Sequence, residues 1–184
     1  MAVKDEIEFR PANMEEDLEF AYLCLFKPGI EKCVKELNGG VWPESRYEFF
    51  KKGFSDPDMM MISHNGIDVG CFCISKTDAA VVLERVYLLH EYQRQGIGNK
   101  LIGMALKAAR ELNKPLELEV LANNTQAINS YKKAGFEQSS EIIVKGWNQK
   151  VTMRHKDTKQ YMHAAVFTAK PLQNRQPQQQ LKVA

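Results

Sequence analysis

The sequence lacks any apolar stretch long enough to cross a membrane. Every uninterrupted run of hydrophobic residues falls far short of the roughly 18 to 20 residues that a membrane-spanning helix needs. The first thirty residues also lack the apolar region of a secretory signal peptide, because charged side chains such as Lys4, Asp5 and Arg10 interrupt them. We therefore expect no membrane association and a cytoplasmic location.

Cysteine is scarce, with four residues in the chain. Cys24, Cys33, Cys71 and Cys73 form neither a C-x-x-C pair nor a Cys/His pair at zinc-binding spacing. Four thiols are too few for a disulfide scaffold, so we expect reduced, structural cysteines and no metal site. Cys71 and Cys73 lie two residues apart, which in a strand places both side chains on one face. A redox pair at these positions is the less favoured alternative.

The chain has no strong excess of one charge sign overall, since its formal net charge is +2. The distribution is uneven, however. Residues 145–184 carry eight Lys or Arg and one Asp, a net charge of +7, which leaves 17 basic and 22 acidic side chains, a net −5, for residues 1–144. A basic segment of this kind can engage nucleic acid or the ribosome through phosphate groups, although most such tails are only solvated.

Residues able to bury surface are few in the last fourteen positions, which are rich in Gln and Pro. We expect residues 171–184 to be a disordered tail. A chain of this size forms one compact domain by default. We assign residues 1–170 to that domain, with its core at about 6–155.

Apolar spacing predicts the elements of the N-terminal half. Ile7 and Phe9 are spaced for one face of a strand, and Asn13 is a candidate N-cap for a helix with apolar Leu18, Ala21, Tyr22 and Leu25. A second helix is expected around residues 44–52. The dipeptide Asn65-Gly66 joins apolar runs at 59–64 and 67–74, a pattern that predicts an antiparallel hairpin.

The C-terminal half alternates between strand and helix patterns. Residues 79–89 and 115–121 are predicted strands, and apolar positions at helical spacing predict a helix from Ile97 to Leu112. Asn123 or Asn124 caps a further predicted helix, which ends at Ala134 and is followed by Gly135 as a left-handed C′ residue and by apolar Phe136. The final strand is either 147–154 or 161–168. The element order predicts a mixed sheet with helices on both faces.

The segment Gln93-Arg94-Gln95-Gly96-Ile97-Gly98 lies between a predicted strand and a predicted helix. Glycines allow a sharp turn and close approach to a ligand, and a helix start offers unpaired N–H groups and the positive end of the helix dipole. This combination favours phosphate binding. The third glycine of a dinucleotide fingerprint is Leu101 here, and the Gly-Lys-Ser/Thr of a P-loop is absent.

At these residues the sequence resembles the GCN5-related N-acetyltransferases, the GNAT family, whose acetyl-CoA motif is Gln or Arg, two residues, Gly, one residue, then Gly or Ala. A second family signature is matched by Asn124, Ala127, Tyr131, Lys133, Gly135 and Phe136. The resemblance covers about residues 6–155. It implies an α/β fold of mixed α+β type, with a largely antiparallel central sheet, a splayed parallel strand pair and helices on both faces.

The resemblance also implies acetyl-CoA as cosubstrate, with no metal. Backbone N–H groups of residues 94–99 are expected to bind the pyrophosphate, while Val86 and Leu88 offer backbone groups to the pantetheine arm as an added strand does. Asn124 is expected to hold the same arm. The implied cofactor-binding set is Val86, Leu88, Gln93, Arg94, Gln95, Gly96, Gly98, Asn99 and Asn124.

The implied reaction is direct attack of a neutral amine on the thioester, without a covalent enzyme intermediate. Tyr131 is the expected catalytic hydrogen-bond donor to the leaving thiolate, or else an aromatic residue of the core. Glu84 is the candidate general base, because it is a charged residue on an otherwise apolar strand. A structural ion pair is the alternative for Glu84, and relatives that use a strand carboxylate often carry it two residues earlier, where Val82 stands here.

Trp42 and Glu44 are the candidate substrate-binding residues, since an aromatic face and a carboxylate suit a cationic amine. Alternatively, Trp42 closes the core and Glu44 opens a helix. The leading hypothesis is an N-acetyltransferase that acts on a primary amine of a small molecule or peptide, as a monomer or homodimer. The alternatives are a CoA-binding regulatory module without turnover and a nucleic-acid- or ribosome-associated protein with a basic tail.

Overall fold

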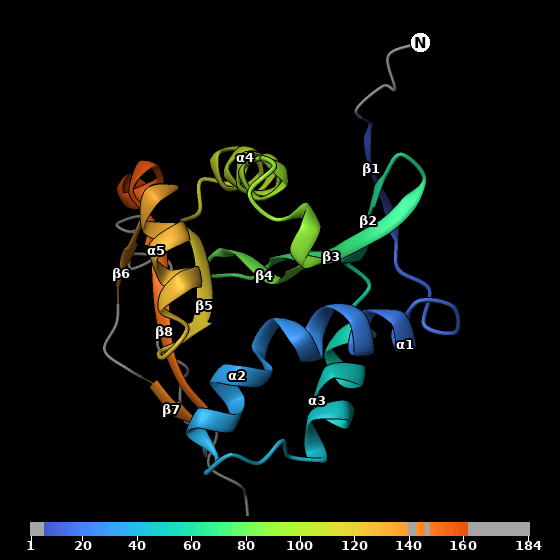
Figure 1. The fold of residues 1–184 in the computed structure, drawn as a ribbon. Helices are drawn as coiled ribbons and strands as arrows, with labels where there is room; N and C mark the ends of the chain where they lie inside the picture. The colour runs from blue at the N-terminus through green and yellow to red at the C-terminus, as the bar shows by residue number, and fades with distance from the viewer. Residues whose placement is uncertain (1–5, 140–142, 146–147, 162–184) are drawn as a thin grey trace, which may run out of the picture.

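The protein is described by a computed structural model that covers residues 6–139, 143–145 and 148–161. An eight-stranded sheet forms its centre, in the order β1-β2-β3-β4-β5-β8-β6, with β7 also paired to β8. Figure 1 shows α4 above β3 and β4, and α2 and α3 below them. The strands are β1 (Ile7–Pro11), β2 (Met59–His64), β3 (Ile67–Lys76), β4 (Val81–Leu88), β5 (Leu116–Leu121), β6 (Phe136–Gln138), β7 (Ile143–Lys145) and β8 (Asn148–His155).

The helical elements alternate with these strands along the chain. They are α1 (Leu18–Phe20), the π-helical turn η1 (Ala21–Phe26), α2 (Lys27–Leu37), α3 (Ser45–Phe54), the 3-10 turn η2 (His90–Tyr92), α4 (Ile97–Glu111), α5 (Thr125–Lys133) and the 3-10 turn η3 (Lys156–Tyr161). Among the described strands, only β4 and β5 are parallel neighbours, and the other pairs are antiparallel. The predicted fold class is confirmed.

The hairpin between β2 and β3 forms at the predicted dipeptide. Asn65 and Gly66 have φ values of 53° and 81°, the left-handed pair that a type I′ turn needs. The helix from Ile97 and the helix before Gly135 are also confirmed. Gly135 has φ of 97°, and Asn124, not Asn123, caps α5 by accepting a hydrogen bond from the Ala127 N–H at 3.1 Å.

The start of the first helix differs from the sequence prediction. Asn13 does not cap it: the Asn13 side chain accepts from the N–H of Glu15 within a turn, and the helix begins at Leu18. The helical path then continues through η1 into α2, past Pro28. Proline supplies no N–H and crowds the carbonyl one turn earlier, and a π-turn is a common way for a helix to absorb such a defect.

Two buried clusters lie on opposite faces of the sheet. The α4-side core joins α4 to the strands and consists of Ile62, Val69, Phe72, Val81, Leu83, Ile97, Leu101, Ile102, Ala105, Ala109, Leu116, Leu118, Val120, Phe136, Val151 and Met153. The α2-side core joins the first helices and α3 to the strands and consists of Leu18, Ala21, Tyr22, Leu25, Phe26, Phe50, Phe54, Met59, Met61, Cys71 and Cys73. Cys71 and Cys73 thus share one face, as predicted.

The C-terminal strand of the described chain is β8, which matches the first of the two predicted alternatives. It pairs with β5 along one edge and with β6 and β7 along the other. Residues 162–168, most of the second alternative, lie outside the described residues, as does the whole predicted tail. Within the described ranges, the helices include none that is long and apolar enough to cross a membrane.

Candidate active site

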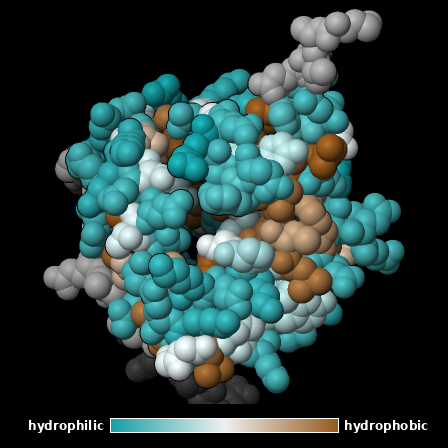
Figure 2. All heavy atoms as spheres, viewed as in Figure 1, coloured by the Kyte–Doolittle hydropathy of each residue, from teal (hydrophilic) through white to brown (hydrophobic). Residues whose placement is uncertain are grey.

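The two parallel strands at the centre of the sheet separate after a short contact. β4 and β5 pair only through Val81 with Leu116 and Val82 with Glu117. Beyond these positions both strands continue, so the sheet is open between them. Figure 2 shows a dark hollow near the centre of this face, where β4, β5 and α2 meet in Figure 1. The opening leaves strand edges free for an extended ligand that pairs as an added strand does.

A β-bulge lies in β4 beside this opening. Cys71 faces Tyr87 and Cys73 faces Glu84, so Arg85 and Val86 together lie opposite one residue of β3. Arg85 has φ of 53°, a left-handed conformation that the extra residue imposes on a non-glycine position.

The bulge changes which side chains share a face. Alternation predicts Val86 with Glu84 and Tyr87 with Leu83, and this is wrong. Leu83, Val86 and Leu88 all pack on the α4-side core, whereas Tyr87 packs on the α2-side core. One additional residue shifts the period-two pattern by one position, so every later side chain of β4 exchanges faces.

The start of α4 has the geometry expected of an anion site. Arg94 and Gly96 have positive φ values of 62° and 88°, so the chain turns sharply before the helix. The backbone N–H groups of residues 94–99 donate no hydrogen bond within the described chain, and Gly98 has open space where a Cβ would be. Six unpaired donors at the positive end of a helix dipole suit a pyrophosphate.

The glutamines of this segment stabilise the turn. The Gln93 amide donates to the carbonyl oxygen of Leu88 at 3.1 Å, and the Gln95 amide donates to the carbonyl of Glu91 at 2.6 Å. Gln93 is half-buried, whereas Arg94, Gln95 and Asn99 are exposed. The carbonyl oxygen of Leu88 therefore already accepts a hydrogen bond from the Gln93 side chain. The backbone of Val86, the other predicted contact of the pantetheine arm, forms no hydrogen bond with a side chain of the described residues.

Tyr131 lies on α5 and packs against the α4-side core. Its ring meets Phe136 edge-on at a centroid distance of 5.8 Å. Burial raises the pKa of the Tyr131 phenol, which keeps it protonated through the neutral range. Both functions considered for this residue, packing and proton donation, are compatible with this position.

Glu84 is engaged through both carboxylate oxygens. Oε1 accepts a hydrogen bond from the Ser75 hydroxyl at 2.7 Å, and Oε2 lies 2.7 Å from the Arg85 guanidinium. The carboxylate is partly exposed, with 34% of its side-chain surface accessible. Glu84 thus has the ion pair that the sequence left as an alternative, and it also keeps the solvent access that a base acting through water needs.

The candidate substrate residues lie on the α2 side of the sheet. Trp42 packs on the α2-side core, where its indole N–H donates to the Tyr22 hydroxyl at 3.1 Å and its ring meets Phe26 at 6.0 Å. Glu44 is exposed immediately before α3. Trp42 therefore closes the core, and Glu44 precedes a helix, in agreement with the structural alternative for each of them.

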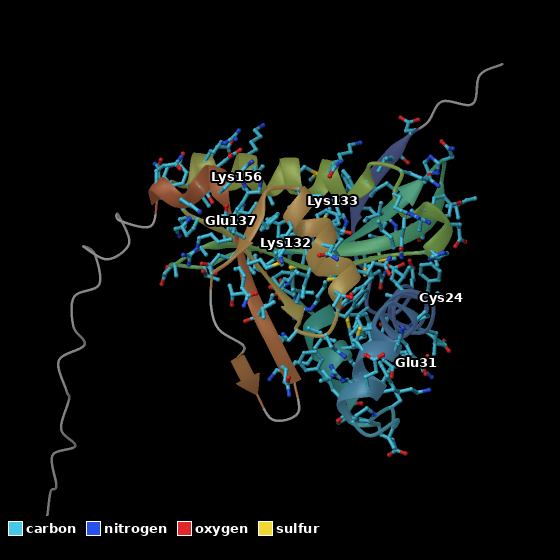
Figure 3. The ribbon with its side chains drawn as sticks, turned by 60° about the vertical axis from the view of Figure 1, so that its left-hand side comes forward. Cys24, Glu31, Lys132, Lys133, Glu137 and Lys156 are labelled. Carbon is cyan, nitrogen blue, oxygen red and sulfur yellow. The ribbon has the colours of Figure 1, made fainter. Side chains whose placement is uncertain are left out.

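A second hollow, of about 320 Å³, lies between α4 and the end of α5. It begins near the glycine-rich turn, at Asn99, and two lysines, Lys133 and Lys156, line it together with His155 and Asp157. Figure 3 shows Lys133 and Lys156 toward the α4 side of the sheet, and Cys24 and Glu31 on the α2 side. His155 is fixed there, because its Nε2 lies 3.0 Å from the Ala134 carbonyl.

Sequence reasoning missed several residues near the two hollows. Tyr87 was placed on the wrong face, and the lysine pair at 133 and 156 joins positions that are distant in the chain. Asn123 binds the carbonyl of Cys33 and the carboxylate of Glu36, which ties the β5–α5 loop to α2. The sequence indicated only the charge of the lysines. The positions of the lysines at the hollow and the contacts of Asn123 and Tyr87 depend on tertiary structure.

The described residues contain no group of His, Cys, Asp or Glu side chains able to hold a metal ion. All four cysteines are free. Burial raises the pKa of the Cys71 thiol, and it raises that of Cys73 to about 11. These two thiols are therefore unreactive at neutral pH.

Known proteins share both the sequence pattern and the fold. An N-alpha-acetyltransferase of Sulfurisphaera tokodaii is 42% identical over 55 residues, which are 29% of this chain and 33% of that protein. The chain thus matches only about a third of the length of this curated relative.

Solved structures resemble the fold over most of the chain. The PaiA N-acetyltransferase of Thermoplasma acidophilum, in complex with coenzyme A, superposes with a TM-score of 0.56 at 20% identity, covering 82% of this chain and 99% of that one. A GNAT family acetyltransferase of Elizabethkingia anophelis with acetyl-CoA bound gives 0.55 at 15% identity, covering 82% and 96%. The model of the acetyltransferase (GNAT) family matches residues 27–136, more than half of the sequence, and the chain belongs to that family.

Proposed function

We propose that the protein transfers the acetyl group of acetyl-CoA to a primary amine of a small molecule or peptide, by direct attack in a ternary complex. The observation that carries this proposal is the opening between β4 and β5 beside six unpaired N–H groups at the start of α4. An extended thioester fits the opening as an added strand, and its pyrophosphate fits the helix start.

The nucleotide end of the cosubstrate lies in the 320 Å³ hollow between α4 and α5. Asn99 connects this hollow to the helix start, and Lys133 and Lys156 supply positive charge for a terminal phosphate. The proposed cofactor-binding set therefore extends from Val86, Leu88, residues 93–99 and Asn124 to these two lysines. Asn124 acts in part indirectly, because its Oδ1 caps α5 and so orients Tyr131.

Tyr131 supplies a hydrogen bond to the sulfur as the carbon–sulfur bond breaks. Since burial raises its pKa above the ordinary value of about 10, and a thiol titrates near 8.5, full proton transfer is unfavourable and hydrogen-bond donation is the expected contribution. The buried thiols of Cys71 and Cys73 have raised pKa values, which supports direct attack by the amine over an acyl-cysteine route.

Glu84 is the proposed acceptor, through water, of the proton that the amine loses. Replacement of Glu84 by Gln and of Ser75 by Ala separates this role from a structural one. Ser75→Ala removes the 2.7 Å hydrogen bond between the Ser75 hydroxyl and Glu84, and Glu84→Gln weakens it. Only Glu84→Gln also removes a base. Loss of the acidic limb of the kcat/KM profile in Glu84→Gln alone supports the base. Equal losses of thermal stability in the two variants, with unchanged kcat, assign Glu84 to a structural role.

The decisive test of the function is ligand binding followed by turnover. Thermal unfolding is measured with acetyl-CoA, CoA and NAD, where NAD controls for a nonspecific nucleotide effect. A ligand at about 100 times its Kd stabilises by roughly 2.7 kcal/mol, which raises Tm by several degrees. A rise with acetyl-CoA and CoA but not NAD, followed by amine-dependent thiol release, is the expected result. No rise at millimolar acetyl-CoA contradicts the proposal.

A further inference from the structure

Tyr87 is a tyrosine at the opening that the proposed mechanism does not yet use. The bulge in β4 turns its ring toward α2, where it meets Phe26 edge-on at a centroid distance of 5.4 Å and an angle of 89°. A Cβ atom at Gly29 would lie 3.4 Å from the ring, so the first turns of α2 pack directly against it. The ring is thus fixed in one orientation by its neighbours.

Tyr87 is largely but not fully buried. Burial raises the pKa of this phenol, and the residue as a whole keeps an intermediate exposure. Its hydroxyl forms no hydrogen bond with the described residues. Because a buried tyrosine hydroxyl normally finds a partner, this group has the capacity to bind a ligand.

Tyr87 and Tyr131 flank the opening from opposite faces of the sheet. Tyr131 packs on the α4-side core and Tyr87 on the α2-side core, and the two phenols are close enough that Tyr131 contributes to the raised pKa of Tyr87. Tyr131 is proposed to contact the leaving sulfur. The acceptor amine attacks the thioester carbonyl carbon next to this sulfur. An amine that does not cross the cosubstrate reaches this carbon from the opposite face of the sheet, which is the face of Tyr87.

We propose that the Tyr87 hydroxyl contacts the acceptor amine and positions it for attack. This inference rests on the proposed acetyl transfer and adds a specificity-determining residue to it. The phenol oxygen accepts a hydrogen bond from an amine N–H, and the hydroxyl stays protonated at neutral pH, so Tyr87 binds and orients the acceptor without acting as its base.

The experiment compares Tyr87→Phe with Tyr47→Phe in the full chain. Tyr47 is the matched control, because it belongs to the same aromatic group through its 4.9 Å contact with Tyr22 but is 37% exposed on α3. Probes are Ser- and Ala-initiated peptides with a free amino end, Nα-acetyl-lysine amide and 1,4-diaminobutane. KM for the most active amine and KM for acetyl-CoA are measured for each variant.

The expected result is an acceptor KM raised about three- to tenfold in Tyr87→Phe, the loss that one neutral hydrogen bond gives, with an unchanged acetyl-CoA KM. Tyr47→Phe is expected to change neither constant. If Tyr87 only packs, Tyr87→Phe leaves the acceptor KM unaltered. This outcome with an active wild type overturns the inference about Tyr87 but not the proposed acetyl transfer. A wild type that binds acetyl-CoA but acetylates none of the amines overturns the proposed function and this inference with it.

Discussion

Gly135 and His155 pack so closely that a Cβ atom at Gly135 would lie 2.8 Å from the imidazole Nε2. Gly135 also has φ of 97°, which disfavours any L side chain. We expect Gly135→Ala to destabilise the protein by about 1 to 3 kcal/mol, since strain and the clash act together. Thermal unfolding measures this change.

Gly103 provides the control for that substitution. It lies in the middle of α4, and no other group comes within 4 Å of the place that an alanine methyl would take, so Gly103→Ala is expected to raise stability by roughly 0.5 to 1 kcal/mol through its helix propensity. A Gly135→Ala protein as stable as the wild type would contradict the close packing of Gly135 on His155.

Asp17 makes stability depend on pH. Its carboxylate binds the Arg10 guanidinium through two contacts of 2.7 Å, and the hydrogen bond from Arg10 holds the pKa of Asp17 below its ordinary value of 3.8. A lowered pKa stabilises the folded state above pH 4, and this contribution is lost as the pH falls through the folded-state value.

Asp17→Asn should therefore unfold more easily than the wild type at neutral pH, by about 1 to 2 kcal/mol, because Arg10 is 40% exposed and solvent screens the pair. The difference should shrink in acid. Urea unfolding at pH 7 and below pH 4 measures both values. Glu31→Gln, which removes an exposed pair with Lys35, is the control and should not change the midpoint.

Tyr131→Phe should lower kcat by about 100-fold and leave CoA affinity nearly unchanged, because the hydroxyl is needed at the leaving sulfur and the ring retains its contact with Phe136. The raised pKa of Tyr131 adds a second expectation. The wild type should show no loss of kcat from ionisation of this phenol between pH 7 and pH 9. The rate of thiol release gives kcat, and isothermal titration gives the Kd for CoA. Equal kcat values for Tyr131→Phe and the wild type would leave Tyr131 with a packing role only.

Lys133→Ala should weaken binding of CoA about two- to fivefold, the range for a partly exposed ion pair. Binding of 3′-dephospho-CoA should not change, because the lysine is expected to meet the terminal phosphate. Lys132→Ala is the matched control: it removes the same charge from the neighbouring residue of α5, which does not line the hollow. If both variants lose CoA affinity equally, general electrostatic attraction accounts for the effect and the lysine site is excluded.

Local patterns predicted much of this fold. Asn65-Gly66 specifies a turn that few other dipeptides form, and the periodic apolar residues of α4 and the glycine after α5 are similarly local signals. Asn13 failed as a cap because nearby Asp17, which binds the N–H of Asn13 at 2.7 Å, organises the turn around the Arg10 contact. The same guanidinium binds Asp68 of β3 at 2.6 Å, so the network joins β1, the turn before α1 and β3, and no short window of sequence contains it.

The candidate site shows the same division. The glycine-rich turn was found from its own residues, and Tyr131 came from the resemblance to the GNAT family, since both belong to short continuous motifs. Tyr87 was not, because strict alternation along residues 81–88 ignores an extra residue that only the pairing with β3 reveals. The association of Lys133 with Lys156 likewise requires β8 to return beside α5.

The bulge at Arg85 also determines how β4 would tolerate insertions and deletions. Removal of one residue between Glu84 and Tyr87 would restore simple alternation and leave Tyr87 on the face of α2, because Glu84 and Tyr87 would then lie two positions apart, opposite Cys73 and Cys71. Removal of two residues would make Glu84 and Tyr87 direct neighbours and carry Tyr87 to the face of α4. The strand can therefore lose its one extra residue without an exchange of faces but not a second residue, in contrast to the surface loops, where each residue gained or lost shifts only its immediate neighbours.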